Sequence, residues 1–477
     1  MSGPADRGPR RPSGERDRRG SGSRPPRGGR PLVDAARQAA YETVVAVHRD
    51  DAYANLALPR ILRELRLHGR DAAFATELTY GTLRWSGTLD AIIAVAADRD
   101  VARIDPPARD ALRLGAYQLL HMRVSPHAAV SSTVDLVRAV AGPSATGFAN
   151  AVLRRITAKP WDGWIADVAP DRDADPFGYL AVAYAHPLWI VRAFAEALGG
   201  EDPADLLAAD NLPAPVHLCA RPGRVERDAL AKEVDGQPGR YSPFAVYLPR
   251  GAPGDLAAVA DGRAHVQDEG SQLVALALAQ APLAGPDRRW LDLCAGPGGK
   301  AALLGALAAQ RGAEVTAVEV APHRAALVEQ AVAGLPVTVE VADGREIEQT
   351  RFDRVLVDAP CSGLGALRRR PESRWRRQPS DLPPLTRLQR ELLVAALRAV
   401  RPGGLVGYVT CSPHLVETQV TVAAARRRSP YPTELVDARP LLPDGGAGPA
   451  GAGPAVQLWP HRHGTDAMYL ALLRRAD

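Results

Sequence analysis

The sequence of 477 residues lacks features that would each point to a particular class of protein. No apolar run approaches the ~18 residues that a membrane-spanning helix needs, and no hydrophobic signal core follows the first methionine. The four cysteines, Cys219, Cys294, Cys361 and Cys411, include no C-x-x-C pair, which argues against a structural zinc site. We therefore expect a cytoplasmic protein, in a reducing compartment, with no disulfide, no metal site and no contact with a membrane.

Lysine is scarce as well, and the basic charge is carried almost entirely by arginine. Residues 1–31 hold nine arginines against three acids, so this segment carries +6 while the whole chain carries +5. The rest of the chain is thus close to neutral. An arginine-, glycine- and proline-rich tail of this kind cannot bury a core and is expected to be disordered. It either contacts nucleic acid through phosphates or is solvated without a partner.

One glycine-rich stretch organises the remainder: Leu291-Asp292-Leu293-Cys294-Ala295-Gly296-Pro297-Gly298-Gly299-Lys300. The apolar run before it predicts a buried strand, and the alanine- and leucine-rich run after it predicts a helix from about residue 300 to 310. A strand, a glycine turn and a helix start can bring backbone N–H groups close to a nucleotide-like ligand. The pattern is neither G-x-G-x-x-G nor G-x-x-x-x-G-K-[ST], so we expect neither a dinucleotide nor a triphosphate.

Further strands alternate with helices after this stretch, which predicts a parallel sheet. Strands over 314–318, 337–341, 354–357 and 405–410 end in Glu319, Asp343, Asp358 and Cys411 respectively. Ligands of such sheets bind beyond the carboxyl ends of the strands, where these side chains gather.

The roles of the acids follow from their positions. Glu319 lies about 20 residues past the glycine turn, which suits hydrogen bonds to a ribose diol, and Asp343 then suits an adenine amine. The helix start at residues 298–300 suits a carboxylate. Adenosine, ribose and an amino-acid tail together predict S-adenosylmethionine as the cofactor.

The pattern over residues 32–156 is helical almost throughout. Apolar residues from Ala36 to Val47 recur at i, i+3, i+4 and i+7, and further helices are predicted over 55–67 and 71–85 and from residues 88, 107 and 128. Short loops between helices predict a compact bundle. The stretches 73–84, 110–117 and 150–154 resemble the RNA-binding antitermination module NusB. Arg84, Arg154 and Arg155 are candidates for phosphate contacts, with a solvated helix face as the alternative.

Two cysteine motifs, Asp358-Ala359-Pro360-Cys361-Ser362-Gly363 and Tyr408-Val409-Thr410-Cys411-Ser412, resemble the paired motifs of the Nop/Sun RNA cytosine-C5 methyltransferases. The glycine stretch and the ending over 459–469 also fit, so the resemblance covers about residues 32–477. A NusB-like front end makes the chain similar to the members that modify bacterial small-subunit ribosomal RNA. One departure is the stretch 215–221, where that family usually has an Arg-Val-Asn-type strand.

The resemblance implies that Cys411 is the nucleophile that adds to C6 of cytosine, that Cys361 assists release as an acid or base, and that Asp358 meets the N3/N4 edge of the base. It implies a site for S-adenosylmethionine formed by Cys294, Ala295, Gly296, Pro297, Gly298, Gly299, Lys300, Glu319, Asp343 and Asp358. Cys219 is expected in the core, and Cys294 is expected to pack against the cofactor loop.

An arginine-rich run follows the first cysteine motif directly. Arginines with a tryptophan beside an active site suit phosphate contacts and stacking on an unpaired base. We predict RNA contacts from Arg368, Arg369, Arg370, Arg374 and Trp375, with a solvated loop as the alternative.

The expected architecture is multi-domain: an all-α NusB-like bundle, then an α/β class I (Rossmann-like) S-adenosylmethionine-dependent methyltransferase domain. We place the tail at 1–31, the bundle at 32–165, a small α/β connecting module at 175–265 and the methyltransferase domain at 266–477, with a linker over 157–180. The expected function is formation of 5-methylcytosine in 16S ribosomal RNA by a monomer. Two alternatives are a transfer RNA methyltransferase and a non-catalytic NusB-like RNA-binding or assembly factor.

Overall fold

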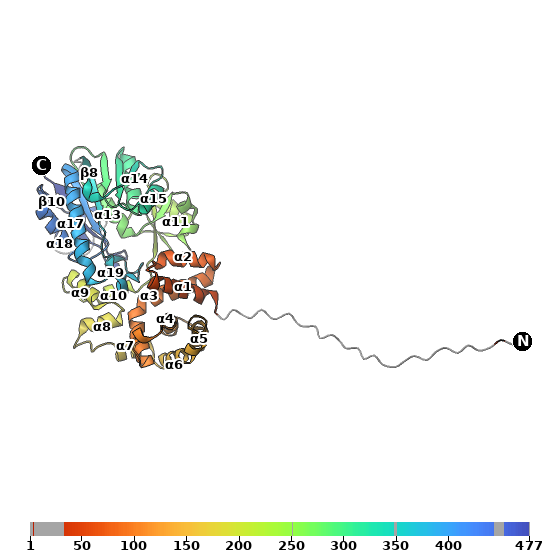
Figure 1. Cartoon of the computed structure of the whole chain (residues 1–477). Coiled ribbons are helices and arrows are strands. Elements are labelled where there is room, and N and C mark those ends of the chain that lie inside the picture. The colour runs from red at the N-terminus through yellow and green to blue at the C-terminus, as the bar shows by residue number, and fades with distance from the viewer. Residues whose placement is uncertain (1–2, 4–32, 250, 348–350, 443–452, 477) are drawn as a thin grey trace.

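The computed structural model describes residues 3, 33–249, 251–347, 351–442 and 453–476. The tail predicted over residues 1–31 lies outside this range, apart from Gly3. Figure 1 shows helices α1 to α7 gathered in one body, the large sheet and its helices in a second, and α8 to α10 beside both. Within the described residues, no helix is both long and apolar enough to cross a membrane.

The N-terminal body is a helical bundle around one apolar core. Asp34 caps the first helix by accepting a hydrogen bond from the N–H of Arg37 at 3.0 Å, and the apolar face predicted from Ala36 to Val47 is buried in the interior. The helices are α1 (Ala35–Arg49), α2 (Ala54–Glu64), α3 (Gly69–Ala97), α4 (Pro106–His121), α5 (Pro126–Ala141), α6 (Thr146–Ile156) and α7 (Trp161–Val168).

Two expectations for this region are wrong. Residues 71–85 and the helix expected from residue 88 form one helix, α3, because Ser86 and Gly87 do not interrupt it; the Ser86 hydroxyl donates to the carbonyl oxygen of Thr82 within the helix. The stretch 157–180 is not a plain linker, since α7 lies within it. Trp164 of α7 is buried in the bundle core and donates its indole hydrogen to the carbonyl oxygen of Ile156 at 3.0 Å.

Three short helices connect the bundle to the rest of the chain: α8 (Pro176–Ala183), α9 (Leu188–Ala197) and α10 (Ala204–Asp210). They share an apolar core with Leu364, Leu367 and Trp459 of the C-terminal body. A small antiparallel sheet of order β2-β3-β1-β4 follows, with one helix between β1 and β2 and another before β4. Its elements are β1 (Val216–Ala220), α11 (Arg227–Glu233), β2 (Gln237–Pro238), β3 (Ala245–Leu248), α12 (Ala257–Ala260) and β4 (Ala264–Val266).

The C-terminal body contains a sheet of order β10-β12-β9-β8-β5-β6-β7, to which β11 adds beside β12. Strands β5 to β9 pair in parallel, which confirms the predicted α/β class, whereas β12 and β10 add an antiparallel edge. The strands are β5 (Arg289–Asp292), β6 (Glu314–Glu319), β7 (Val337–Val341), β8 (Phe352–Asp358), β9 (Val400–Thr410), β10 (Thr433–Val436), β11 (Val456–Gln457) and β12 (Tyr469–Arg475).

Helices cover both faces of this sheet. Side chains of α13 and α14 pack in one core with Trp290, and side chains of α17 and α18 pack in a second core with the next residue along the strand, Leu291. This alternation is what a strand buried on both faces requires. The helices are α13 (Glu269–Gln280), α14 (Gly299–Arg311), α15 (Pro322–Ala331), α16 (Ser373–Arg376), α17 (Leu382–Ala399), α18 (Gln419–Arg428) and α19 (Pro460–His463).

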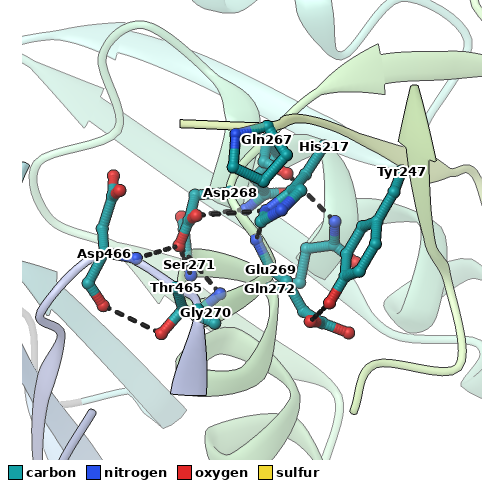
Figure 2. Close-up of polar contacts among 12 residues, drawn as sticks. His217, Tyr247, Gln267, Asp268, Glu269, Gly270, Ser271, Gln272, Thr465 and Asp466 are labelled. Atoms are coloured by element: carbon teal, nitrogen blue, oxygen red, sulfur yellow. Dashed lines mark hydrogen bonds and ion pairs between the residues drawn. The ribbon is translucent and has the colours of Figure 1, made fainter. Parts of the chain in front are cut away.

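A buried polar cluster joins the small sheet to the large one, as Figure 2 shows. His217 of β1, at the departure from the family pattern, stacks its ring on that of Tyr247 at 4.5 Å and accepts the N–H of Glu269 at 3.0 Å. Asp268 caps α13 and also accepts the N–H of Asp466 at 3.2 Å. The cluster therefore holds the start of α13 and the loop before β12 in one place.

Candidate active site

The glycine loop predicted to hold a ligand runs between β5 and α14, and two of its glycines are required by close packing. Gly298 has φ +107°, and a Cβ there would lie 2.6 Å from the Cβ of Ala331. A Cβ on Gly296 would lie 2.2 Å from Oε2 of Glu319. The loop therefore sits directly on the end of β6, where the predicted ribose-binding acid is.

Glu319 is buried at that strand end. Its Oε2 accepts the N–H of Gly296 at 3.2 Å, its Oε1 accepts the N–H of Ala321 at 3.0 Å, and Arg324 lies 3.5 Å away. Asp343 follows the neighbouring strand β7 and forms an ion pair with Arg345 at 2.6 Å. The two acids thus follow adjacent parallel strands, as predicted, and each is held by local contacts.

Asp292, at the end of β5, is fully buried beneath the loop. Its Oδ2 has no hydrogen-bond partner among the described residues, and its Oδ1 accepts only a long contact of 3.4 Å from the N–H of Cys294. Burial, and next the negative charge of Asp358, raise the pKa of Asp292 to about 7. A buried carboxyl oxygen without a partner fits a cationic ligand group, because such a group would supply the missing hydrogen bond.

Lys300, in the first turn of α14, donates to Oδ2 of Asp358 at 2.8 Å. Burial lowers the pKa of Lys300, but the charge of Asp358 and the thiol of Cys411 outweigh it and raise that pKa overall. The ammonium group is thus held beside both the acid of the first cysteine motif and the cysteine of the second.

The two motif cysteines are brought together. Strands β8 and β9 pair in parallel, with Asp358 opposite Val409, so the loops that follow them are neighbours. The Sγ atoms of Cys361 and Cys411 lie 3.4 Å apart. The hydrogen bond with Cys411, followed by burial, raises the pKa of Cys361 well above its usual value. The contact with the second thiol and burial thus both disfavour ionisation of Cys361.

The other two cysteines lie apart from this pair. Cys219 is fully buried in the apolar core, as expected, and burial raises the pKa of its thiol. Cys294 packs against the apolar core on the α17 side of the sheet, and burial raises its pKa well above the usual value. Neither thiol has the neighbours of a reactive one.

The arginine-rich segment is placed differently from the prediction. Arg374 is fully buried, Arg368 is buried, Arg369 is held by two carboxylates, and Trp375 donates to a carbonyl oxygen of α3. Each of these four side chains is engaged within the protein, so the structure does not support RNA contact from them, and that contact stays a prediction. Only Arg370 is exposed, and its guanidinium lies 5.2 Å from the centre of the Tyr53 ring.

The same segment instead docks the helical bundle onto the C-terminal body. Arg374 donates to Oδ1 of Asn211 at 2.8 Å and to the carbonyl oxygen of Ala185 at 3.1 Å. A Cβ on Gly87 of α3 would lie 2.3 Å from the Trp375 ring, so the ring rests on the helix backbone there. The charge run in the sequence gave no signal for this docking role, since the segment's hydrogen-bond partners lie up to 329 residues away.

Arg84, a second candidate for phosphate contact, is also buried, whereas Arg154 and Arg155 are exposed on α6. The polar residues that immediately follow Cys361 and Cys411, Ser362 and Ser412, were not singled out in the sequence. Both are buried and bonded to one carboxylate, that of Glu417.

Two family models match the chain. The model described as 16S rRNA methyltransferase RsmB/F matches residues 279–474, and the model of the NusB family matches residues 34–158.

Several known proteins are similar over nearly their full length. A protein of Mycobacterium tuberculosis (strain ATCC 25618 / H37Rv), whose provisional name describes a methyltransferase, is 59% identical over 450 residues, which cover 94% of this chain and 97% of that protein. The ribosomal RNA small subunit methyltransferase B of Vibrio cholerae is 32% identical, with 92% and 96% covered. The enzyme of the same name from Pseudomonas putida is 33% identical, with 84% and 90% covered.

Solved structures share the fold. The crystal structure of PH0851 superimposes with a TM-score of 0.77 at 22% identity and covers 93% of this chain and 99% of that one. The structure of NSun6 from Pyrococcus horikoshii has a TM-score of 0.53 at 17% identity and covers 61% and 98%.

Proposed function

The chain belongs to the RsmB/F family of ribosomal RNA methyltransferases, and from this we propose that it forms 5-methylcytosine in 16S ribosomal RNA with S-adenosylmethionine as methyl donor. The observation that carries the proposal is the thiol pair: Cys361 and Cys411 lie 3.4 Å apart beside the Lys300–Asp358 ion pair. Methylation at C5 of cytosine needs a nucleophile for C6 and a second group to assist release, and two neighbouring thiols meet both needs.

The cofactor residues proposed are those of the glycine loop with the acids around it. Glu319 would accept hydrogen bonds from the ribose diol, Asp343 would accept one from the adenine amine, and Asp292 would meet the amino group of the methionine part. Val320 and Val341 are 64% and 56% exposed at the ends of β6 and β7, so they offer apolar contact to a base. When bound there, S-adenosylmethionine supplies an activated methyl group.

The chain's own residues would act on the cytosine in two stages. The Cys411 thiolate forms a bond from sulfur to C6, and the electron pair of the C5–C6 double bond then makes C5 nucleophilic for methylation. After C5 carries the methyl group, its proton leaves to a base and the C6–S bond breaks, which restores the double bond and returns the thiolate. Asp358, held by Lys300, accepts a hydrogen bond from the exocyclic amine, and Cys361 assists the proton transfer at release.

The helical bundle matched by the NusB family model would supply much of the RNA affinity. Arg154 and Arg155 are exposed on α6 and suit phosphate contacts, which do not depend on sequence. A cytosine within a helix of the RNA would have to leave its stack to reach the cysteine pair.

The test is to map 5-methylcytosine in ribosomal and transfer RNA from a strain that lacks the protein. We expect one position of 16S ribosomal RNA to lose the modification, to regain it with the wild-type gene, and to stay unmodified with Cys411→Ala. Loss at a transfer RNA position alone would overturn the proposed substrate. Full 5-methylcytosine at every position in both RNA classes would overturn the activity itself.

A further inference from the structure

Each of the two paired cysteines is followed directly by a serine, and both serines bind the same carboxylate. Oε2 of Glu417 accepts the hydroxyl of Ser362 at 2.5 Å and the hydroxyl of Ser412 at 2.6 Å. Oε1 of Glu417 accepts the backbone N–H of Ser362 at 2.8 Å. The loop after β8 and the loop after β9 are therefore tied to one side chain, each at the residue next to its cysteine.

Further contacts fix Glu417 in place. Gln389 of α17 donates one amide group to Oε1 of Glu417 at 3.0 Å and to the carbonyl oxygen of Pro360 at 2.9 Å. Tyr408, within β9, donates its hydroxyl to the carbonyl oxygen of Glu417 at 2.7 Å. The glutamate is thus anchored to the strand that leads to Cys411 and to the helix behind the Cys361 loop.

Because Glu417 is buried, its carboxylate needs a hydrogen-bond partner for each oxygen. The side chain of Glu417 is fully inaccessible, as are Thr410, Ser412 and Gln389 around it. A buried carboxylate is tolerated only where its oxygens are fully hydrogen-bonded, and the partners described for this one are neutral donors rather than a cation. An apolar residue at position 417 would leave two buried serine hydroxyls without their acceptor. The network therefore depends on a hydrogen-bond acceptor at this position.

We propose that Glu417 is a positioning residue that holds the thiols of Cys361 and Cys411 in contact through Ser362 and Ser412. This rests on the proposed function only in assigning both thiols to methyl transfer. The geometry itself, a shared acceptor one residue away from each thiol, is independent of which RNA is modified.

The charge of Glu417 adds a second effect on the pair. After the hydrogen bond with Cys411 and burial, the charge of Glu417 is among the causes that raise the pKa of Cys361. The charge of Glu417 thus disfavours ionisation of Cys361, in addition to the hydrogen bonds that position its loop.

The first test compares Glu417→Gln with Glu269→Gln. Glu269 is a matched control because it is also fully buried and accepts two backbone N–H groups and one hydroxyl, from Tyr241, Ser242 and Tyr247, away from the cysteines. Misplacing a reacting group by about 1 Å costs on the order of 10²-fold in rate, so we expect Glu417→Gln to lower kcat by that order and to leave KM for RNA within about twofold. Equal kcat losses in both variants would overturn the positioning role.

The second test needs no RNA. Alkylation of each thiol by iodoacetamide is followed by peptide mass spectrometry from pH 6 to 10 in the full-length protein. In Glu417→Gln, we expect the Cys361 profile to move to lower pH than in the wild type, because the charge that disfavours its ionisation is gone. Unchanged profiles for both thiols would overturn the proposal even if the enzyme methylates ribosomal RNA. A shift in an enzyme that modifies another RNA would support the positioning role and count only against the proposed substrate.

Should Glu417→Gln fold poorly, Ser412→Ala removes one arm of the network and leaves the carboxylate bonded to Ser362. We expect an intermediate loss of kcat and an intermediate shift of the Cys361 profile. A wild-type kcat together with wild-type alkylation in Ser412→Ala would contradict the coupling of the two loops through Glu417.

Discussion

The indole of Trp375 donates its Nε1 hydrogen to the carbonyl oxygen of Leu83, at 2.9 Å, across the contact between the C-terminal body and the helical bundle. The ring rests on Gly87 one turn along the same helix. Trp375 follows the first cysteine loop closely, and the neighbouring Arg377 donates to the carbonyl oxygen of Ser362 at 3.1 Å. The bundle is therefore held by the segment that also supports the active-site loop.

Trp375→Ala should loosen this contact. Loss of a large aromatic side chain from a packed position costs up to about 3–5 kcal/mol, and less where the ring is partly exposed, as it is here. We expect a higher KM for RNA and a separate, earlier unfolding transition of the bundle in differential scanning calorimetry. Arg427→Ala, which removes an exposed side chain of α18 in the C-terminal body, is the control. A single unshifted transition in Trp375→Ala would refute the docking role.

Much of the site could be predicted from sequence because the parallel sheet imposes its own geometry. The carboxyl ends of β5, β6, β8 and β9 meet at one edge, so Glu319, Asp358 and Cys411 had to gather once the strands were located. The placement of the Cys361 loop beside Cys411 followed from the same pairing. Local patterns sufficed for these residues because strand ends are local features.

The docking role of the arginine-rich segment could not be predicted in this way. Arg374 and Trp375 look like solvated or RNA-binding residues because nothing near them in sequence is their partner. Their partners in α3 and around Ala185 are distant in the chain and are chosen by how the two bodies pack. Glu417 was missed for the same reason, since its role depends on two serines that are 50 residues apart and meet only in the folded sheet.

Glu319→Gln should weaken the binding of S-adenosylmethionine. A charge-assisted hydrogen bond contributes roughly 1.5–3 kcal/mol, so its loss should lower the affinity about 10- to 150-fold. Glu314→Gln is the matched control because Glu314 begins the same strand at the opposite edge of the sheet and is exposed. Isothermal titration calorimetry gives both affinities. Equal affinities for the two variants would show that Glu319 does not bind the cofactor.

Binding of S-adenosylmethionine near pH 6 should release a proton from Asp292. The pKa of Asp292 is raised to about 7, so this carboxyl is mostly protonated at pH 6 in the free protein. A cationic ligand would lower that pKa and release close to one proton, which calorimetry in buffers of different ionisation enthalpy measures. Asp292→Asn should abolish the release. Asp210→Asn should not, although the pKa of buried Asp210 is also raised to about 7, because Asp210 lies on α10.

The sign of the effect of Asp292 on stability follows from the same shift. Between its unfolded pKa of 3.8 and its folded pKa of about 7, the folded state holds a proton that the unfolded state has released. Its contribution to the free energy of unfolding therefore falls as pH rises through this window and is constant above it. The free energy of unfolding of the cofactor-free protein, measured in urea, should fall between pH 5 and pH 8. This loss of stability should be smaller in Asp292→Asn than in the wild type. An equal loss would mean that the buried carboxyl does not carry the proton.

Arg154→Gln should weaken RNA binding without changing sequence preference. One lost phosphate contact lowers the slope of log affinity against log salt concentration by about 0.7–0.9, because one fewer counterion is released. Filter binding at several salt concentrations measures the slope. Arg427→Gln, an exposed arginine on α18 of the C-terminal body, is the comparison. If Arg427→Gln lowers this salt-dependence slope and Arg154→Gln does not, the RNA-binding surface lies on the C-terminal body and not on the bundle.

The contact between Cys361 and Cys411 leads to the last prediction, which separates their roles. If Cys411 attacks C6, Cys411→Ala should abolish both methyl transfer and any covalent link to RNA. If Cys361 assists only release, Cys361→Ala should still form the link and break it slowly. Protein joined to RNA should then accumulate in Cys361→Ala and survive denaturing electrophoresis.

The reverse assignment is a chemical alternative, because Cys361 also follows the end of a parallel strand, directly after Pro360, and its Sγ lies 3.4 Å from that of Cys411. The electrostatic surroundings of Cys361 support its proposed assignment to release. The pKa of Cys361 is raised well above its usual value, first by the hydrogen bond with Cys411 and then by burial. A thiolate is the nucleophilic form, so the raised pKa of the Cys361 thiol weighs against Cys361 as the nucleophile. A trapped RNA adduct in Cys411→Ala, together with none in Cys361→Ala, would reverse the two roles and leave the rest of the site unchanged.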